Sequence, residues 1–437
     1  MSAVASKVSP VERYRAAFDE RTDAQGMLTD IRKAAFERFA SLGFPTTRNE
    51  DWKYTNLRRF ESRAFASAQA APVALDEAQW IAGSGVRIVL VNGHAAASLS
   101  TTAPQPPGVT VVTLSRWLAN NPHEVAALLR EQEAQDAAAF DALNTAFFDD
   151  GVVIDIADGV TLDQPIYVLH QWTPGVQSAM SHPKIFVRAG RDSRCALIEH
   201  YLGPDDVETF TNASIALTLC AGARVSHYRL QHESIRSFHV ATVRARLDAH
   251  SRYACQDIAF GAALGRTSIT ATLAGPGAEA SLNGLFAPSG TQHLDTYTLV
   301  DHVAPHTISN EAYRGIAAGR GRGVYRGKVI VRQGAQKIDS KQSSRNLLLS
   351  PTAEIDTRPE LEIYADDVKC AHGATTGQLD ATALFYLRSR GISEEDARAL
   401  LIRAFAESML SGIESVPVRE YLEQQLQQRF AALEVQS

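Results

Sequence analysis

Cysteine is scarce in this chain of 437 residues, which has only Cys195, Cys220, Cys255 and Cys370. The four are far apart in the sequence, and no pair has the CxxC spacing. This pattern excludes the disulfide framework of small secreted domains and the clustered ligands of a zinc finger. The cysteine usage favours a reducing compartment, and we expect a cytoplasmic protein.

Long apolar runs and an excess of positive charge are also missing. No hydrophobic run approaches the roughly 18 residues that a membrane-spanning helix needs. The N-terminal stretch turns charged early and lacks the apolar core of a secretory signal. With a formal net charge of −6, the chain has no basic excess for binding nucleic acid or an anionic membrane. We therefore expect neither nucleic acid nor membrane among its partners.

The common catalytic and nucleotide-binding motifs are absent: there is no GxSxG, HExxH or Rossmann fingerprint. The segment that begins at Gly321 comes close to a phosphate-binding loop. It fails because five residues separate Gly321 from Gly327, and Val329 replaces the Ser or Thr that binds magnesium. We expect a chain that does not bind ATP itself and is not an enzyme.

The composition, 45% hydrophobic and 21% charged, is that of an ordinary globular protein with a large core. Changes in the hydrophobic pattern divide the chain into three regions. Residues 1–150 are predicted to be helical and mixed, residues 151–375 to be all-β, and residues 376–437 to be helical.

Within the first region, apolar residues recur at helical spacing over 28–42, and Gly43 stands where a C-terminal cap is expected. A second helical pattern covers 122–148. Short apolar runs at 86–91 and 109–112 predict strands between the two helical patterns.

The all-β region carries a repeat of 27 to 29 residues. Segments that begin at Gly222, Ala249, Gly277, Pro305 and Gly334 each open with a small or turn-forming residue and then alternate. A steady period of this length is typical of a stacked solenoid. Because the leucine and asparagine pattern of leucine-rich repeats is missing, a parallel β-helix is the best match, with a large sandwich as the alternative.

The C-terminal region is predicted to hold three helices. Asp380 can cap the first, which ends at Gly391, and Ser393 with Asp396 resembles a capping box for the second. The apolar stripes expected on the last two helices comprise Ala397, Leu400, Leu401, Ala404, Phe405, Ser408, Val418, Tyr421, Leu422, Leu426, Phe430 and Leu433. Such helices either cap the open end of the solenoid or dock a partner, and the pattern favours neither role.

The most informative segment lies where the all-β region ends. Cys370 and His372 are two residues apart, so on an extended strand they share one face. Thiolate and imidazole suit soft transition metals and iron–sulfur units, but they supply two ligands where a closed metal site needs four. We expect half of a metal site, completed by a second subunit at the open edge of the last coil.

The alternative is that Cys370 and His372 are packed structural residues, since a lone cysteine on a strand is usually a small buried hydrophobe. Against this, Asp366, Asp367 and the segment 373–377 indicate a polar, flexible neighbourhood. Four other histidines are expected to be hydrogen-bonded structural residues, namely His227, His232, His239 and His250.

The stretch 314–332 is basic. Its side chains are expected to form a solvated face, with docking of an acidic partner surface as the alternative. The residues are Arg314, Arg320, Arg322, Arg326, Lys328 and Arg332.

Several long motifs resemble the SufB/SufD family of the Suf iron–sulfur cluster assembly machinery. PELEIYADDVKCAHGAT at 359–375, followed by GQLDATALFYLRSRGISEEDARALLIRAFA at 377–406, is similar to the C-terminal signature of the SufD branch. FPTTRNEDWKYTNL at 44–57 resembles its early motif, and the segment 143–170 resembles the entry into the shared β-helix. The motifs together span nearly the whole chain.

The resemblance implies a right-handed parallel β-helix flanked by helical N- and C-terminal regions. It implies a cytoplasmic complex with a SufB-like scaffold, paired through the β-helix edge, and with a SufC-like ATPase docked on the C-terminal helices. The family histidine at the scaffold junction falls on His372, with Cys370 beside it. Iron or a nascent cluster would be bound there transiently, with no cofactor held stably by this chain alone.

Two departures separate the chain from SufB. The segment 350–354, which precedes the last motif, lacks the cysteine that SufB carries in that region, and His372 is followed by Gly373-Ala374 where SufB tends to have HEA. Both favour a SufD-like scaffold that cannot build a cluster alone. The alternatives are a polysaccharide-acting β-helix enzyme and a purely structural oligomerisation module, and the open edge also allows a homodimer.

Overall fold

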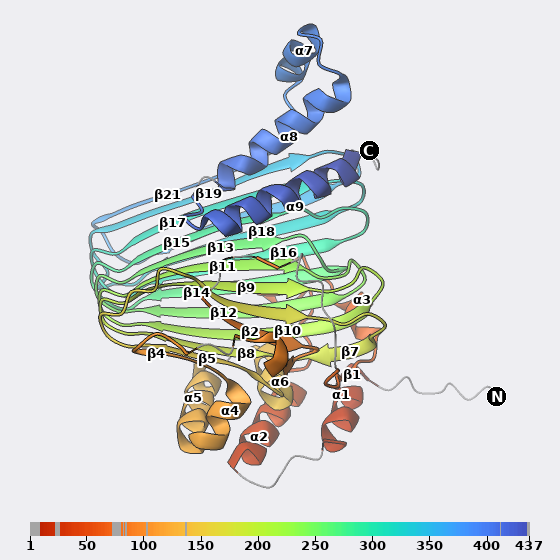
Figure 1. The fold of residues 1–437 in the computed structure, drawn as a ribbon. Coiled ribbons are helices and arrows are strands. Elements are labelled where there is room, and N and C mark those ends of the chain that lie inside the picture. The colour runs from red at the N-terminus through yellow and green to blue at the C-terminus, as the bar shows by residue number, and fades with distance from the viewer. Residues whose placement is uncertain are drawn as a thin grey trace, which may run out of the picture.

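The computed structural model describes residues 9–21, 27–71, 80–81, 83, 85–101, 104–135, 138–410 and 412–434. Its centre is a parallel β-helix of about eight turns over residues 151–377, with a helical region before it and helices after it (Figure 1). The sequence-based prediction of a parallel β-helix with helical flanks is therefore confirmed.

Two large sheets form the walls of the β-helix, and successive strands alternate between them. Sheet A comprises β1 (Ala66–Ser67), β4 (Val109–Thr113), β5 (Gly151–Ile156), β7 (Gln177–Ser181), β8 (Lys184–Ala189), β10 (Glu208–Leu219), β12 (Phe238–Leu247), β14 (Leu264–Leu273), β16 (His293–His302), β18 (Arg322–Val331) and β20 (Glu354–Ile363). Sheet B comprises β2 (Val86–Val91), β3 (His94–Ala95), β6 (Ile166–Gln171), β9 (Arg194–Leu202), β11 (Arg224–His232), β13 (Arg252–Ala259), β15 (Glu279–Phe286), β17 (Ile308–Ala317), β19 (Ile338–Leu348) and β21 (Val368–Gly377).

The repeat seen in the sequence corresponds to one turn residue in each coil. Gly222, His250, Gly277, His306 and Lys337 all have a positive φ, between 57° and 73°. Their backbone N–H groups each donate to a carbonyl of the next coil, as in Gly277 to Pro305. Each coil therefore needs one left-handed residue at the same place, which glycine adopts at the lowest cost.

We expect Gly277→Ala to destabilise the protein by about 1–2 kcal/mol, because an alanine Cβ is unfavourable at positive φ. Here the added Cβ would also lie 2.4 Å from Nδ1 of His250 in the preceding coil. Gly334→Ala is the matched control, since its Cβ would meet nothing within 4 Å. Urea unfolding of the two variants checks the prediction, and equal stabilities would contradict it.

Inward-facing side chains of the two sheets meet in a continuous hydrophobic core. Sheet B strands alternate, as in β11, where Val225 is buried inside while Leu230 packs outward beneath the C-terminal helices. The parallel register holds over whole strands, for example from Ile308–Asp339 to Ala317–Leu348 between β17 and β19. Equivalent side chains are therefore stacked along the axis of the β-helix.

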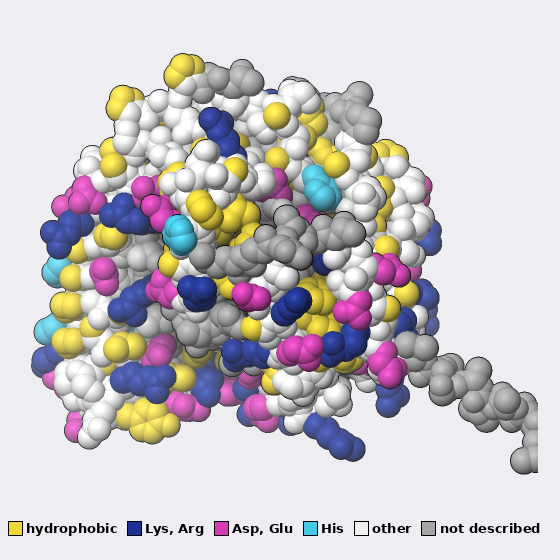
Figure 2. Space-filling view, turned by 90° about the horizontal axis from the view of Figure 1, so that it is seen from below, with side chains coloured by type: hydrophobic (Ala, Val, Ile, Leu, Met, Phe, Trp, Pro, Cys, Tyr) yellow, Lys and Arg dark blue, Asp and Glu magenta, His cyan; other side chains and the backbone are white. Residues whose placement is uncertain are grey.

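Helices of the N-terminal region cover the first coils of sheet A, at the end of the β-helix opposite to β20 and β21 (Figure 1). They are α1 (Pro10–Asp19), α2 (Met27–Leu42), α3 (Arg58–Glu61), α4 (Leu114–Asn120), α5 (Pro122–Gln135) and α6 (Ala139–Phe147), with short 3-10 turns η1 (Glu50–Trp52) and η3 (Ala97–Leu99). Gly43, with a φ of 63°, follows α2 as expected. Seen from this end, positive and negative side chains are interspersed over the surface (Figure 2).

The C-terminal helices are α7 (Ala381–Ser389), α8 (Glu394–Leu410) and α9 (Val416–Glu434). Asp380 caps α7 and Ser393 caps α8, as predicted. Residues of α8 and α9 pack against the outer face of sheet B, and α7 projects away from it (Figure 1). The helices α8 and α9 thus cover a side of the β-helix and do not form the end cap that was one expectation.

The stripe predicted for α8 was partly wrong. Ile402, Ala406 and Leu410 are the residues buried against sheet B, while Leu400 is 48% exposed. On α9 the prediction is confirmed for Leu422 and its neighbours Val418 and Leu426. The helices of the described ranges are all too short or too polar to cross a bilayer.

Candidate functional site

The β-helix ends in two adjacent edge strands. β20 is the last strand of sheet A and β21 is the last strand of sheet B, and each has 10 residues. β20 contains Pro359, which lacks a backbone donor and is typical of edge strands. β21 has no proline, so its outer edge presents donors and acceptors along its length.

Cys370 and His372 both lie on the inward-facing side of β21. Cys370 pairs with Ser340 and His372 pairs with Gln342 across the β19–β21 ladder. Both partners are buried inside the β-helix. His372 is nonetheless exposed and Cys370 half-buried, because β21 belongs to the last coil.

The segment 373–377 is exposed, as expected for an accessible edge, but it is a regular strand and not the flexible segment that the sequence suggested. β21 continues to Gly377, and Asn346 donates to the Thr376 hydroxyl at 3.3 Å from the neighbouring strand. The two candidate ligands therefore belong to a regular strand, which fixes their backbone positions.

A column of polar side chains runs along the axis of the β-helix, from Cys370 toward the preceding coils. The hydroxyl of Ser340 contacts that of Ser309 at 2.8 Å, and Ser309 contacts Nε2 of His302 at 3.0 Å. Burial lowers the pKa of His302 to about 4, so this imidazole is neutral at pH 7. Burial, reinforced by Asp339, raises the pKa of the Cys370 thiol. The thiol is therefore protonated in the isolated chain at neutral pH.

A second column of polar side chains runs along the axis from His372 toward the preceding coils. Gln342 lies beneath it and donates through Nε2 to Oε1 of Glu311 at 3.2 Å, and the Tyr325 hydroxyl donates to Oε2 at 3.3 Å. Burial raises the pKa of Glu311 to about 7, and hydrogen bonds from Thr298, Tyr325 and Gln342 offset only part of this effect. A buried carboxyl that titrates near neutral pH thus lies two strands below the open end.

Cys370 and His372 remain a pair of candidate ligands in this chain. Among the residues that the structure describes, no group of three or more His, Cys, Asp and Glu side chains is arranged to hold a metal ion. A thiolate and an imidazole can bind iron, but a stable site requires further ligands.

Two of the four histidines expected to be structural are seen in buried hydrogen bonds. His227 contacts Glu199 at 3.0 Å and the Tyr253 hydroxyl at 2.9 Å, and His239 contacts Glu233 at 2.7 Å.

The basic residues of 314–332 are mostly paired with acidic residues of the same chain. Arg326 is buried and contacts Asp51 at 2.7 Å and Glu360 at 2.9 Å, tying the segment after α2 to the β-helix. The neighbouring ion pairs are Arg322–Asp356, Lys328–Glu362 and Arg332–Asp301. The predicted solvated face is confirmed for Arg322 and Arg332, whose side chains are 38% and 52% exposed, but not for the buried Arg326.

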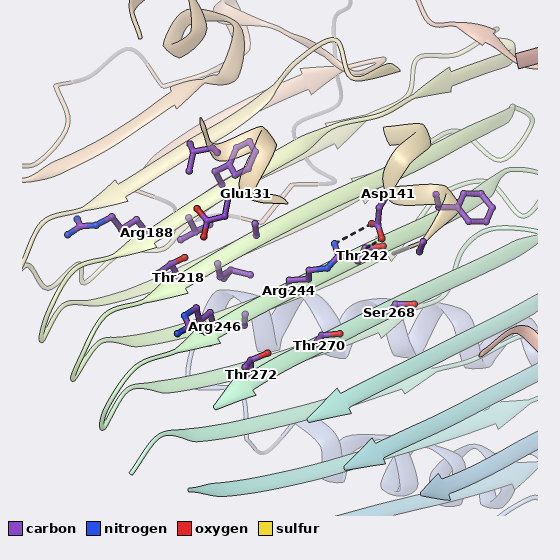
Figure 3. A pocket seen from close by; sticks show the side chains of 18 of the residues that line it. Glu131, Asp141, Arg188, Thr218, Thr242, Arg244, Arg246, Ser268, Thr270 and Thr272 are labelled. Carbon is purple, nitrogen blue, oxygen red and sulfur yellow. Dashed lines mark hydrogen bonds and ion pairs between the residues drawn. The ribbon is translucent and has the colours of Figure 1, made fainter. Parts of the chain in front are cut away.

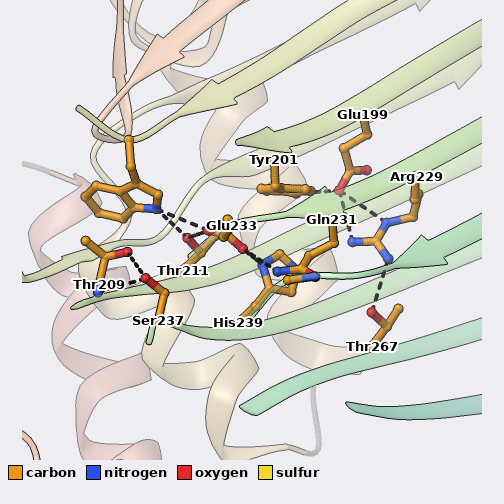
Figure 4. A network of polar contacts seen from close by, with 12 residues as sticks. Glu199, Tyr201, Thr209, Thr211, Arg229, Gln231, Glu233, Ser237, His239 and Thr267 are labelled. Carbon is orange, nitrogen blue, oxygen red and sulfur yellow. Dashed lines mark hydrogen bonds and ion pairs between the residues drawn. The ribbon is translucent and has the colours of Figure 1, made fainter. Parts of the chain in front are cut away.

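A charged network fills the interior of the middle coils (Figure 4). Arg229 lies between Glu199, at 3.2 Å, and Asp257, at 2.7 Å. Burial opposes the ionised form of Glu199, but Arg229 and His227 together hold the pKa of this carboxyl well below its usual range. Burial raises the pKa of Asp257, despite the contact with Arg229.

The network continues to Glu233, which lies close to Trp172 and to Thr211 of β10. Glu233 accepts hydrogen bonds from the Trp172 indole N–H at 3.1 Å, from the Thr211 hydroxyl at 2.5 Å and from the Gln231 amide at 3.0 Å (Figure 4). Burial opposes ionisation of Glu233, but His239 and the hydrogen bonds from Thr211 and Gln231 hold its pKa below the usual value. Glu199, Arg229 and Glu233 were not predicted from the sequence to belong to such a network. A signal was present in β11, where His227, Arg229 and Gln231 occupy successive inward-facing positions.

A cavity of about 1140 Å³ lies on the outer face of sheet A, beneath α4 and α5 (Figure 3). Thr242, Ser268 and Thr270 line its floor together with Arg244, which forms an ion pair with Asp141 of α6. The cavity faces outward from sheet A, whereas Cys370 and His372 face inward from sheet B. The two features are therefore separate.

Comparisons with known proteins agree with the fold and the motifs. Residues 172–405 match the SUF system FeS cluster assembly, SufBD core domain, and residues 12–168 match the SufBD protein N-terminal region. The iron–sulfur cluster assembly SufBD family protein of Synechocystis is 33% identical, over 89% of this chain and 88% of its own length. Escherichia coli iron–sulfur cluster assembly protein SufD is 29% identical over 89% of both chains.

A plant relative is also similar over most of the chain. The chloroplastic protein ABCI7 of Arabidopsis thaliana is 27% identical, over 91% of this chain and 84% of its own length. The matches run through the N-terminal helices, the β-helix and the strand that carries Cys370 and His372. This chain therefore belongs to the SufBD family of iron–sulfur cluster assembly proteins.

Proposed function

We propose that this chain is a non-catalytic scaffold subunit of the SUF machinery and that His372 binds iron or a nascent cluster at a junction with a second scaffold. The observation that carries the proposal is the position of His372 and Cys370, which face inward on the last coil and yet remain accessible. Iron or the cluster is the cargo of this site. His372 is the main ligand and Cys370 the secondary one, since burial keeps its thiol protonated.

The partner at the open end is a SufB-like β-helix that supplies cysteine thiolates. The edge of β21 can continue sheet B into a second chain by backbone hydrogen bonds, as in strand addition. β20 offers a less regular edge because of Pro359. A second copy of this chain could use the same edge, but it would bring only another His372 and Cys370.

The C-terminal helices supply a second docking surface, for a SufC-like ATPase. Phe385 and Tyr386 of α7 are 74% and 56% exposed, and Leu400 of α8 is 48% exposed. Large apolar side chains on a projecting helix favour a protein partner. ATP hydrolysis in that partner would move the helix and so open or close the scaffold junction.

We also assign the chain to the cytoplasm. All four cysteines are free thiols, which fits a reducing compartment. Membership of an iron–sulfur assembly family favours the scaffold function over the polysaccharide-acting enzyme. Mutation of His372 distinguishes the scaffold function from a purely structural oligomerisation module.

Replacing His372 with alanine tests the proposed site. In cells that depend on this chain, we expect H372A to abolish cluster maturation, because the junction loses its main ligand, while the scaffolds and the ATPase still co-purify. Activity of a cluster-dependent reporter enzyme is the readout. His123→Ala, at an exposed position on α5, is the control and should mature clusters normally. Normal maturation in H372A would favour the oligomerisation module.

The docking surface on α7 has its own test. We expect Phe385→Ser combined with Tyr386→Ser to reduce co-purification of the ATPase at least tenfold, because the exposed apolar contact is lost, and to leave the partner scaffold bound. Neither side chain is buried, so the fold should be unaffected, as circular dichroism would show. Retention of the ATPase at wild-type levels would place its docking site elsewhere.

A further inference from the structure

The column of side chains beneath His372 contains a hydrogen-bond acceptor without a partner. Gln342 is only 3% exposed, and its Nε2 donates to Glu311. Within the described residues, Oε1 of Gln342 is buried and has no hydrogen-bond partner. A buried acceptor left unpaired costs about 1–3 kcal/mol, so this oxygen requires an explanation.

The register shows which side chain follows Gln342 in this column. Leu282, Glu311, Gln342 and His372 are consecutive partners along sheet B, and all four occupy inward-facing positions stacked along the axis. Neighbouring strands are about 4.8 Å apart, so the next residue stacked on Gln342 toward the open end is His372.

We propose that Gln342 and Glu311 are positioning residues for His372: Oε1 of Gln342 accepts the N–H of one imidazole nitrogen, which leaves the lone pair of the other nitrogen for a ligand. This inference rests on the proposed function, in which that ligand is iron. Histidines that bind metals almost always donate their second N–H to such an acceptor, which fixes the tautomer.

Glu311 determines which end of the amide faces outward. Its carboxylate, when ionised, can only accept hydrogen bonds, so Nε2 of Gln342 faces Glu311 and Oε1 is the end of the amide left for His372. The Tyr325 hydroxyl holds the other carboxylate oxygen at 3.3 Å, which keeps the Glu311 side chain in place.

Among the described residues, the neighbouring column under Cys370 has no buried acceptor left unpaired in this way. Ser340 already contacts the Ser309 hydroxyl, and Ser309 contacts His302. Ser340→Ala therefore provides a matched control: the same strand, the adjacent inward position and a similar burial, with no contact to the proposed positioning pair.

The tautomer of His372 is measured by NMR of the full chain labelled with ¹⁵N-histidine, at pH 8.5, where Glu311 is ionised because its pKa is about 7. H372A assigns the signal. We expect one dominant neutral tautomer in the wild type and in Ser340→Ala. In Gln342→Met, the signal should change to the mixture shown by exposed His123. Glu311→Gln should weaken the preference of His372 for one tautomer, because the two amides at 311 and 342 can pair in either orientation. This variant provides the test if Gln342→Met fails to fold.

A second readout is the affinity of the assembled complex for ferrous iron. We expect Gln342→Met to lower it by about 10- to 100-fold, the usual effect of removing a partner of a metal-binding histidine. A mixed tautomer in the wild type, or one unchanged by Gln342→Met and Glu311→Gln, would overturn the positioning role. Those NMR results do not depend on cluster maturation, so failure of H372A to affect maturation would count against the proposed function alone.

Discussion

Arg229→Ala is expected to destabilise the protein by about 3–5 kcal/mol, the cost of breaking a buried ion pair from one side. Arg229 is 1% exposed and lies between the carboxylates of Glu199 and Asp257. Its removal would leave these two neighbouring carboxyls inside the β-helix without the guanidinium that pairs with both. They would have to take up protons or admit water, and both responses cost free energy.

Urea unfolding followed by circular dichroism measures this effect. Arg252→Ala is the matched control, because Arg252 lies on the next strand of sheet B and pairs with Glu279 at the surface, with 54% of its side chain exposed. Exposed ion pairs contribute about 0–1 kcal/mol, so this control should unfold near the wild-type midpoint. Equal midpoints for the two variants would show that the interior network does not stabilise the fold.

Glu311→Gln is expected to change how stability depends on pH. Burial raises the pKa of Glu311 from 4.5 to about 7, so the folded state holds a proton that the unfolded state releases. This contribution to stability is complete below pH 4.5 and is lost as the pH rises through 7. A pKa shift of this size corresponds to about 3 kcal/mol of stability. Glutamine does not titrate, so the Glu311→Gln variant does not lose this stability as the pH rises.

The free energy of unfolding, measured for both proteins between pH 4.5 and pH 8.5, provides the comparison. The wild type should lose about 3 kcal/mol relative to Glu311→Gln over this interval, and most of the difference should develop below pH 7.5. Parallel pH profiles would mean that Glu311 is ionised throughout and that its interior position carries no such cost.

Sequence reasoning was most successful where one residue type controls the backbone. The repeat was visible because Gly222 and Gly277 occupy the left-handed turn of their coils. The same turn in other coils uses His250, His306 or Lys337, which explains why the repeat was faint. Capping by Asp380 and Ser393 was likewise local and could be recognised from spacing alone.

Features that depend on packing between distant segments were harder to predict. The stripe on α8 was misplaced because Ile402 and Ala406, rather than Leu400, face the outer surface of sheet B. The partners of Arg229 come from strands 28 to 30 residues away in the sequence, which no periodicity in a single strand reveals. Cys370 and His372 could be placed on one face, but the columns beneath them required the register.

The uninterrupted edge of β21 limits how long this chain can remain alone in a cell. Pro359 removes one backbone donor from the edge of β20, whereas the edge of β21 can pair with any extended segment, including one from another copy. Synthesis in step with the proposed partner scaffold would keep this edge covered. Overproduction of this subunit by itself is the circumstance in which end-to-end fibres or precipitates would form.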